Sequence, residues 1–137
     1  MKKNILLLAF AMAGLSACQS QDSRPSTSES AAATTPSKPH EDLNVAAFRE
    51  KMKEPGIVLL DVRTPAETAA GKIEGAVELD FYDPDFAGKV AGLDKDKTYL
   101  VYCRSGNRSG KACRLMKQQG FGHLYNLEGG YLAWSAE

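Results

Sequence analysis

The chain has 137 residues, of which 43% are hydrophobic, and its 17 basic side chains balance 17 acidic ones. This composition is typical of one globular domain, and the zero net charge argues against a nucleic-acid-binding protein, which normally carries a basic excess. Two histidines and three cysteines are also too few for a histidine-rich metal site.

The first residues have the pattern of a secretory signal. Lys2 and Lys3 precede an apolar run at 5–15, which as a helix of about 16 Å is too short for the roughly 30 Å hydrocarbon core of a membrane. Small residues then lead to Cys18, and Leu-Ser-Ala-Cys at 15–18 resembles the lipobox of bacterial lipoproteins. We expect residues 1–17 to be a signal peptide and Cys18 to be lipidated. The alternative is an ordinary signal peptide that ends near a cysteine by chance.

The lipobox resemblance implies a membrane anchor made of acyl chains on Cys18. Without Lys2 and Lys3 the mature chain is slightly acidic, so electrostatic attraction to anionic lipid cannot replace that anchor. Gln19 stands after the cysteine, which resembles the pattern of lipoproteins sent to the outer membrane. The predicted location is therefore the periplasmic face of a bacterial membrane, and specifically the outer membrane.

The segment after Cys18 has the composition of a tether. From 19 to 42 there is no Val, Ile, Leu, Met, Phe, Tyr or Trp, while Ser and Thr contribute nine residues and Pro three. Such a segment buries too little apolar surface to offset the entropy lost on ordering it. We therefore expect a disordered tether at 18–42, in which His40 is a solvated linker residue rather than a metal ligand.

The remaining residues, 43–137, have the pattern of one α/β domain. Asn44 can cap a helix that ends before Pro55, and a second helix is predicted at 108–119, ended by Gly120. The continuous apolar runs at 57–60 and 99–102 are typical of strands covered on both faces, and shorter strands are predicted at 76–79 and 123–127. With one more helix between the strands at 57–60 and 76–79, this order favours a parallel sheet with helices on either side.

Cys103 is the most informative residue of this domain. It follows the apolar run at 99–102, and sites of open parallel sheets form at the carboxyl ends of strands. A loop with Gly106 then leads into the helix at 108–119, so loop N–H groups and the helix N-terminus can stabilise a thiolate. Six basic and no acidic residues lie between 97 and 127. The pattern predicts a reactive cysteine rather than a small buried one.

The other candidate residues are better explained as structural. Cys113 lies beside Ala112 and Met116 on the predicted helix, which favours core packing, and a disulfide with Cys103 is doubtful because the helix leads away from the loop. The ten-residue spacing of Cys103, Cys113 and His123 is unlike a zinc ligand set, so we expect no metal. Lys111 and Lys117 are expected to be surface charges, and His123 to be structural.

Four segments in order complete a recognisable pattern. They are Leu-Asp-Val-Arg at 60–63 with Pro65 and Glu67, Gly-Lys-Ile-Glu-Gly-Ala at 71–76, the loop at 103–109, and Asn-Leu-Glu-Gly-Gly-Tyr at 126–131 with Ala133 and Trp134. Together they resemble the rhodanese family of sulfurtransferases in its single-domain form. Lys72 and Glu74 stand where the family often has His and Pro, neither at a catalytic position. The resemblance implies a central parallel five-stranded sheet with helices on both faces.

The resemblance also implies a mechanism without a cofactor. Cys103 would take sulfane sulfur from a small anionic donor such as thiosulfate, and the resulting persulfide would pass it to cyanide or a thiol. Arg104 is the candidate for the donor's anionic end, and Arg108 for bracing the loop or sharing that role. The implied substrate-binding loop is Arg104, Ser105, Gly106, Asn107 and Arg108, and the implied structural support is Asp61, Arg63 and Ser109.

Three other functions remain as alternatives. A cysteine phosphatase or arsenate reductase uses a cysteine and an arginine separated by five residues, whereas only four lie between Cys103 and Arg108. The shorter loop makes a smaller anion nest, meaning a smaller ring of converging backbone N–H groups, which suits one sulfur atom rather than a tetrahedral oxyanion. A non-catalytic rhodanese-like binding module often lacks the cysteine. A thiol-disulfide role lacks the usual Cys-x-x-Cys pair.

Overall fold

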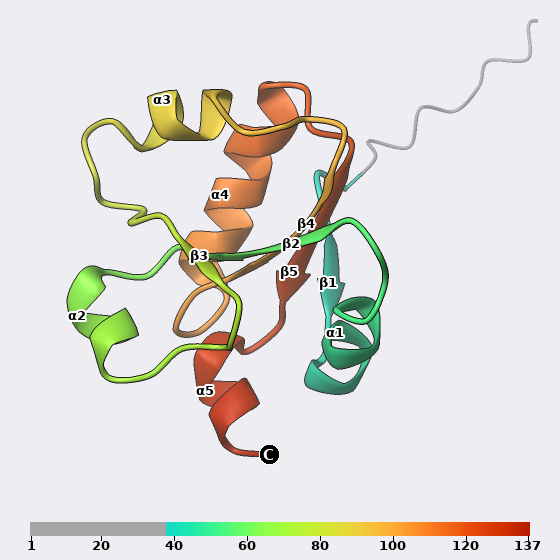
Figure 1. Ribbon diagram of the computed structural model, residues 1–137, viewed down its shortest axis with the longest axis vertical. Helices are drawn as coiled ribbons and strands as arrows, with labels where there is room; N and C mark the ends of the chain where they lie inside the picture. Colours follow the sequence, from blue (N-terminus) through green and yellow to red (C-terminus); the bar gives the residue numbers. More distant parts are fainter. Residues whose placement is uncertain (1–37) are drawn as a thin grey trace, which may run out of the picture. The chain divides into compact units, whose positions relative to one another are not determined.

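The computed structural model describes residues 38–137 (Figure 1). The predicted signal peptide at 1–17, Cys18 and most of the predicted tether lie outside these residues. Within 38–137, no helix is both long enough and apolar enough to cross a membrane.

Strands and helices alternate along the chain. The elements are β1 Glu41–Leu43, α1 Val45–Lys51, β2 Ile57–Asp61, α2 Pro65–Ala69, β3 Val77–Glu78, α3 Phe86–Ala91, β4 Thr98–Tyr102, α4 Asn107–Gln118, β5 His123–Leu127 and α5 Gly130–Ser135. The five strands form one sheet in the order β1-β5-β4-β2-β3, and every pair is parallel. This confirms the predicted α/β class and the five-stranded parallel sheet.

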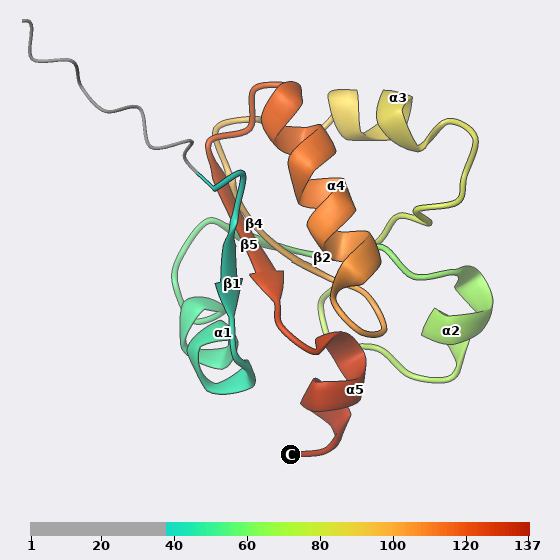
Figure 2. The same ribbon diagram turned by 180° about the vertical axis from the view of Figure 1, so that it is seen from behind.

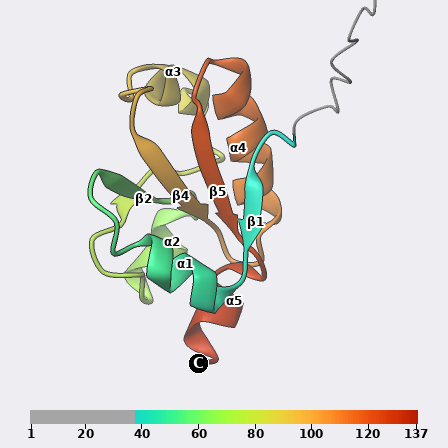
Figure 3. The ribbon, with the colours of Figure 1, turned by 90° about the vertical axis from the view of Figure 1, so that its right-hand side faces the viewer.

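Helices cover the sheet on both faces (Figure 3). The central strand β4 needs this cover because its apolar side chains point to both faces. Successive side chains of β4 point to opposite faces, so Tyr99 and Val101 enter one apolar cluster while Leu100 and Tyr102 enter the other. The first cluster includes residues of α3 and α4, and the second includes Val45 and Phe48 of α1 together with partly buried residues of α5. Because both faces are buried, β4 is apolar at every position from Tyr99 to Tyr102.

The first strand lies partly in the predicted tether, so the predicted domain start at 43 is too late. β1 begins at Glu41 and pairs with β5, with Asp42 opposite Asn126. As one of the two edge strands it contributes only three residues, and its backbone hydrogen bonds require no apolar pattern. The composition of Glu41 and Asp42 therefore gives no sign that they form a strand.

The prediction that His40 is a solvated linker residue is also wrong, because the side chain of His40 is buried against the domain. His40 is 9% exposed, and its Nε2 lies 3.2 Å from Asp42 Oδ1. Its ring packs against α4 at Gly110, where an added Cβ would lie 3.7 Å from Nε2. Burial lowers the pKa of His40, with Asp42 acting in the opposite direction. His40 belongs to the domain and directly precedes the edge strand β1.

The short helices α3 and α5 are absent from the predicted order of elements. Each has six residues, and each contains a glycine at a position that weakens the helix signal, Gly88 in α3 and Gly130 in α5. The predicted strand at 76–79 is shorter in the structure, and the predicted helix at 108–119 begins and ends one residue earlier. These differences leave the loop after β4 in its predicted place.

Candidate active site

Cys103 directly follows β4, the central strand, and its thiol lies inside the loop that leads into α4. Figure 2 shows this loop between β4 and α4. The residue is only 1% exposed. The backbone N–H of Gly106 donates to Cys103 Sγ at 3.1 Å, and the hydroxyl of Ser109 donates to it at 3.3 Å. The thiol is therefore enclosed by hydrogen-bond donors.

These donors decide the ionisation of the thiol. Burial by itself raises the pKa of Cys103, but hydrogen bonds from the Ser109 hydroxyl and from the N–H groups of Ser109, Ser105 and Gly106 lower it. The donors outweigh burial, and the pKa of Cys103 lies below the ordinary value of 9.0. A thiolate is the nucleophilic form of cysteine, so the site favours nucleophilic chemistry at sulfur.

Helix α5 orients the first peptides of this loop. The N–H of Tyr131 donates to the carbonyl oxygen of Cys103 at 2.7 Å, and the N–H of Leu132 donates to that of Arg104 at 3.0 Å. In a trans peptide the N–H points away from the carbonyl oxygen, so holding these two carbonyls toward α5 turns the N–H groups of Arg104 and Ser105 the opposite way. The C-terminal helix thereby helps to shape the anion nest.

Gly130 allows this close approach. Its φ is 59°, and an added Cβ would lie 2.5 Å from the carbonyl oxygen of Cys103. A side chain here would be strained and would also displace α5 from the loop. Gly130 therefore belongs to the architecture of the site.

Gly106 closes the loop from the other side. It has a φ of 94°, and an added Cβ would lie 3.1 Å from the carbonyl oxygen of Leu127. The Asn126 side-chain amide donates to Gly106 O at 3.3 Å and to Asp42 Oδ1 at 2.9 Å. The loop is thus held against the carboxyl ends of β5 and β1.

Asp61 and Arg63, the predicted supports, form a buried ion pair. Arg63 donates from Nε and Nη2 to the Asp61 carboxylate at 2.9 and 2.7 Å, and from Nη2 to the carbonyl oxygen of Gly71 at 2.7 Å. The Arg63 guanidinium also lies 4.1 Å from the ring centroid of Tyr131. This ion pair connects the end of β2 to α5, and so to the loop that α5 orients.

The two arginines of the loop have different surroundings. Arg104 is exposed, as are Ser105 and Asn107. Arg108 instead donates to Glu67 of α2 from both terminal nitrogens, at 2.8 Å to Oε2 and 2.6 Å to Oε1. This ion pair favours the bracing role for Arg108 and leaves Arg104 as the exposed arginine of the loop.

The sequence also matches a model of the Rhodanese-like domain over residues 44–137. The chain belongs to the rhodanese-like family. The match covers most of the chain and includes the Cys103 loop. Helix α5, which contacts that loop, lies within it as well.

Several curated relatives of this rhodanese-like chain are named sulfurtransferases. It is 40% identical over 97 residues to the putative sulfurtransferase YtwF of Bacillus subtilis, covering 70% of this chain and 91% of the relative. It is 42% identical over 79 residues to a sulfurtransferase of Allochromatium vinosum, covering 58% and 72%. It is 37% identical over 84 residues to the thiosulfate sulfurtransferase GlpE of Stutzerimonas stutzeri, covering 61% and 74%.

Solved structures show the same rhodanese-like fold. A crystal structure of a rhodanese-related protein from Thermoplasma volcanium superposes with a TM-score of 0.62 at 31% identity, covering 71% of this chain and 92% of the other. A rhodanese-like domain protein from Staphylococcus aureus gives 0.61 at 26% identity, covering 69% and 90%. The architecture that positions the Cys103 loop is therefore a known fold.

The remaining cysteine and histidine candidates lie apart from the thiol site. Cys113 is fully buried in α4, which confirms core packing, and burial raises its pKa to about 12. Cys103 and Cys113 are both free thiols. His123 is exposed at the start of β5, the end of that strand opposite to the Cys103 loop. Between residues 38 and 137, no group of three or more His, Cys, Asp or Glu side chains is placed to hold a metal ion.

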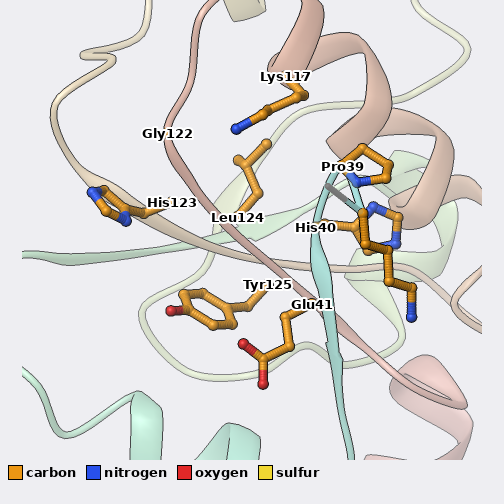
Figure 4. Close-up of a pocket in the computed structure, with 9 residues that line it drawn as sticks. Pro39, His40, Glu41, Lys117, Gly122, His123, Leu124 and Tyr125 are labelled. Carbon is orange, nitrogen blue, oxygen red and sulfur yellow. The ribbon is translucent and has the colours of Figure 1, made fainter. Parts of the chain in front are cut away.

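A separate hollow of about 360 Å³ lies beside the amino ends of β1 and β5 (Figure 4). Its lining residues are Lys38, Pro39, His40, Glu41, Lys117, Gly122, His123, Leu124 and Tyr125. None of them is a predicted site residue. The two imidazoles lie on opposite sides of the view and do not converge on one point.

Three residues that hold the loop were not among the predicted site residues. Asp42 and Asn126 act through Gly106, and Glu67 acts through Arg108. Only Glu67 carries a local signal, because Thr64 and Glu67 have the spacing of a helix capping box. The partners of all three are distant in the sequence, so their contacts become visible only in the fold.

Proposed function

We propose that this rhodanese-like protein is a sulfurtransferase that carries sulfane sulfur on Cys103 as a persulfide. The observation that carries the proposal is a buried thiol whose pKa is lowered by the hydrogen-bond donors of its own loop. The names of the curated relatives support the same reaction class. A donor such as thiosulfate would supply the sulfur, and cyanide or a thiol would accept it.

Each of the two steps is a nucleophilic substitution at sulfur. The Cys103 thiolate attacks the outer sulfur of thiosulfate, the sulfur–sulfur bond of the donor breaks, and its electron pair leaves with sulfite. The product is a Cys103 persulfide anion. An acceptor thiolate then attacks the terminal sulfur to form its own persulfide, or cyanide attacks to form thiocyanate, and the Cys103 thiolate returns. Atoms and electrons balance without a cofactor, and the pathway is of the ping-pong kind.

The loop is suited to both anionic states of Cys103. Fixed N–H groups stabilise a thiolate or a persulfide without reorganising during the reaction. Arg104 is exposed and can attract the sulfonate end of the donor. The Arg108 side chain would have to leave Glu67 before it could bind an oxyanion, which argues against a phosphatase-like use of the same loop.

Mass spectrometry after treatment with thiosulfate tests this function. We expect one added sulfur on the peptide that contains Cys103, and its loss when cyanide is added. Cys103→Ser should abolish sulfur transfer without unfolding the domain, because a hydroxyl is neither ionised nor strongly nucleophilic at neutral pH. Cys113→Ser is the matched control and should retain most activity. Turnover of thiosulfate and cyanide by Cys103→Ser would overturn the assignment.

We further propose that the enzyme works at the periplasmic face of a bacterial outer membrane, anchored by lipid on Cys18. The support is the lipobox-like sequence at 15–18, the apolar run before it and Gln19 after it. The Ser-, Thr- and Pro-rich segment up to residue 37 would connect the anchor to the domain.

A further inference from the structure

Arg108 lies in the first turn of α4, between two groups that bind the Cys103 thiol. The N–H of Gly106 and the hydroxyl of Ser109 both donate to Sγ, and both residues lie within two positions of Arg108. A shift of this turn would move both donors relative to the sulfur. Whatever holds Arg108 therefore acts on the thiol through the backbone.

Glu67 of α2 is the side chain that holds Arg108. Its two carboxylate oxygens accept hydrogen bonds from Arg108 Nη1 and Nη2 at 2.8 and 2.6 Å. This bidentate pairing fixes the orientation of the guanidinium as well as its distance, which a single contact cannot do. Both side chains are mostly buried, with 27% of Glu67 and 16% of Arg108 exposed, so solvent screens the pair only in part.

Glu67 is itself held by the start of its own helix. The N–H and the hydroxyl of Thr64 donate to Glu67 Oε2 at 3.1 and 2.9 Å. The N–H of Glu67 donates in return to Thr64 Oγ1 at 3.4 Å, which completes a capping box. Hydrogen bonds from Arg108 and Thr64 lower the pKa of Glu67 to about 2, against a smaller opposing effect of burial. The carboxylate therefore stays charged over the whole range in which a cysteine thiol titrates.

The Arg108 guanidinium has an aromatic neighbour besides Glu67. Its Cζ lies 5.5 Å from the ring centroid of Tyr82, an exposed residue in the connection between β3 and α3. A cation near an aromatic ring is attracted to it, so Tyr82 adds a second restraint. The first turn of α4 is thus connected to two segments that precede β4 in the chain.

We propose that Glu67 is a positioning residue of the enzyme. Acting through Arg108, it keeps the first turn of α4 where Gly106 and Ser109 donate to Cys103 Sγ. The inference rests on the proposed function, since a positioned thiolate matters only if Cys103 reacts. It differs from a stabilising ion pair, which would affect only the free energy of unfolding. It also differs from a charge shield, in which Glu67 would merely neutralise Arg108.

The pH dependence of Cys103 alkylation separates these three roles. The full chain is treated with iodoacetamide between about pH 5 and pH 10, and alkylation is followed by mass spectrometry of the peptide that contains Cys103. Three variants are compared with the wild type. Glu67→Gln removes the charge, and Glu67→Asp keeps the charge on a side chain too short for both hydrogen bonds. Glu50→Gln, the control, removes an exposed ion pair between Glu50 of α1 and Lys53, which follows that helix.

Both Glu67 variants should raise the alkylation midpoint by about one pH unit, which corresponds to the loss of one hydrogen bond to the thiolate. The control should leave the midpoint unchanged. With thiosulfate, the same two variants should lower kcat while KM changes little, because Arg104 remains in place. Circular dichroism verifies that each variant is folded, and Glu67→Asp serves alone if Glu67→Gln does not fold.

Three results would overturn the proposal. An unchanged midpoint with a lower melting temperature would make the pair purely stabilising. A lower midpoint in Glu67→Gln would mean that a released Arg108 stabilises the thiolate, which is the charge-shield role. A wild-type midpoint in Glu67→Asp would show that only the charge matters. Alkylation needs no sulfur donor, so a wild type that forms no persulfide would refute the proposed function while leaving this test of Glu67 valid.

Discussion

Arg104 and Arg108 carry the same charge in the same loop, but only one of them is available to a small anion. Arg108 has both terminal nitrogens on Glu67, whereas Arg104 is exposed. The sequence leaves open whether Arg108 braces the loop or shares in binding the donor, because the partner of Arg108 comes from a helix 41 residues earlier. We therefore propose that Arg104, rather than Arg108, binds the anionic end of the donor.

Arg104→Ala should accordingly weaken capture of an anionic donor. A charge-assisted contact is worth roughly 1.5 to 3 kcal/mol, so kcat/KM for thiosulfate should fall by about ten- to a hundredfold. Added salt should bring the wild type closer to the variant, because an exposed charge is screened. The matched control is Lys111→Ala, which removes an exposed cation from α4. Equal thiosulfate kinetics for Arg104→Ala and wild type at low salt would leave the backbone nest as the anion binder.

Among the elements, α5 shows how a six-residue helix can shape a site on another segment. The N–H groups of Tyr131 and Leu132, in its first turn, donate to the carbonyl oxygens of Cys103 and Arg104. Arg63 then lies against the Tyr131 ring and ties α5 to the end of β2. The loop conformation is thus set by contacts from two elements that are far apart in the chain.

Gly130→Ala tests this contribution of α5. The φ of 59° and the 2.5 Å approach of an added Cβ to Cys103 O should cost more than about 1 kcal/mol in the free energy of unfolding. Activity should fall further than the loss of stability explains, because the peptide groups that follow Cys103 lose their orientation.

Gly122→Ala is the control, since no atom lies within 4 Å of its added Cβ and its φ is not in the left-handed region. Wild-type activity in Gly130→Ala would contradict this account of α5. Urea unfolding and thiosulfate kinetics provide the two measurements.

The contact between α2 and α4 should make stability depend on pH. The pKa of Glu67 is lowered from 4.5 to about 2 in the folded protein, so folding favours its charged form. The stabilisation is fully present above about pH 4.5 and is lost as the pH falls toward 2. Wild type should therefore be more stable than Glu67→Gln at neutral pH, and the difference should shrink at about pH 2.5. Urea unfolding at both pH values measures it, and a difference that does not shrink would remove Glu67 from the acid response.

At the scale of the whole molecule, the sequence predicts what depends on local pattern. The apolar runs within β2 and β4 and the helix α4 appear within about a residue of their predicted places. Strand β1 does not, because an edge strand held by backbone hydrogen bonds needs no apolar residues. The same distinction applies to the site. Cys103 is marked by its strand, loop and helix, whereas the roles of Glu67, Asn126 and Asp42 depend on partners far away in the chain.

The predicted anchor concerns the part of the chain before residue 38, and it determines where the enzyme works. If Cys18 is lipidated, the wild type should incorporate labelled fatty acid and sediment with the membrane fraction, since no helix in 38–137 could span a membrane. Cys18→Ala should block labelling and release the protein.

Cys18→Ala alone can leave the apolar run uncleaved, so Leu15→Ala combined with Cys18→Ala is the sharper test. The two changes together create the small-residue sequence of an ordinary cleavage site. That double variant should be soluble and keep full sulfurtransferase activity. Cys113→Ala is the control and should stay at the membrane. A wild type that takes up no fatty acid, or a double variant that still sediments with membranes, would contradict the lipid anchor.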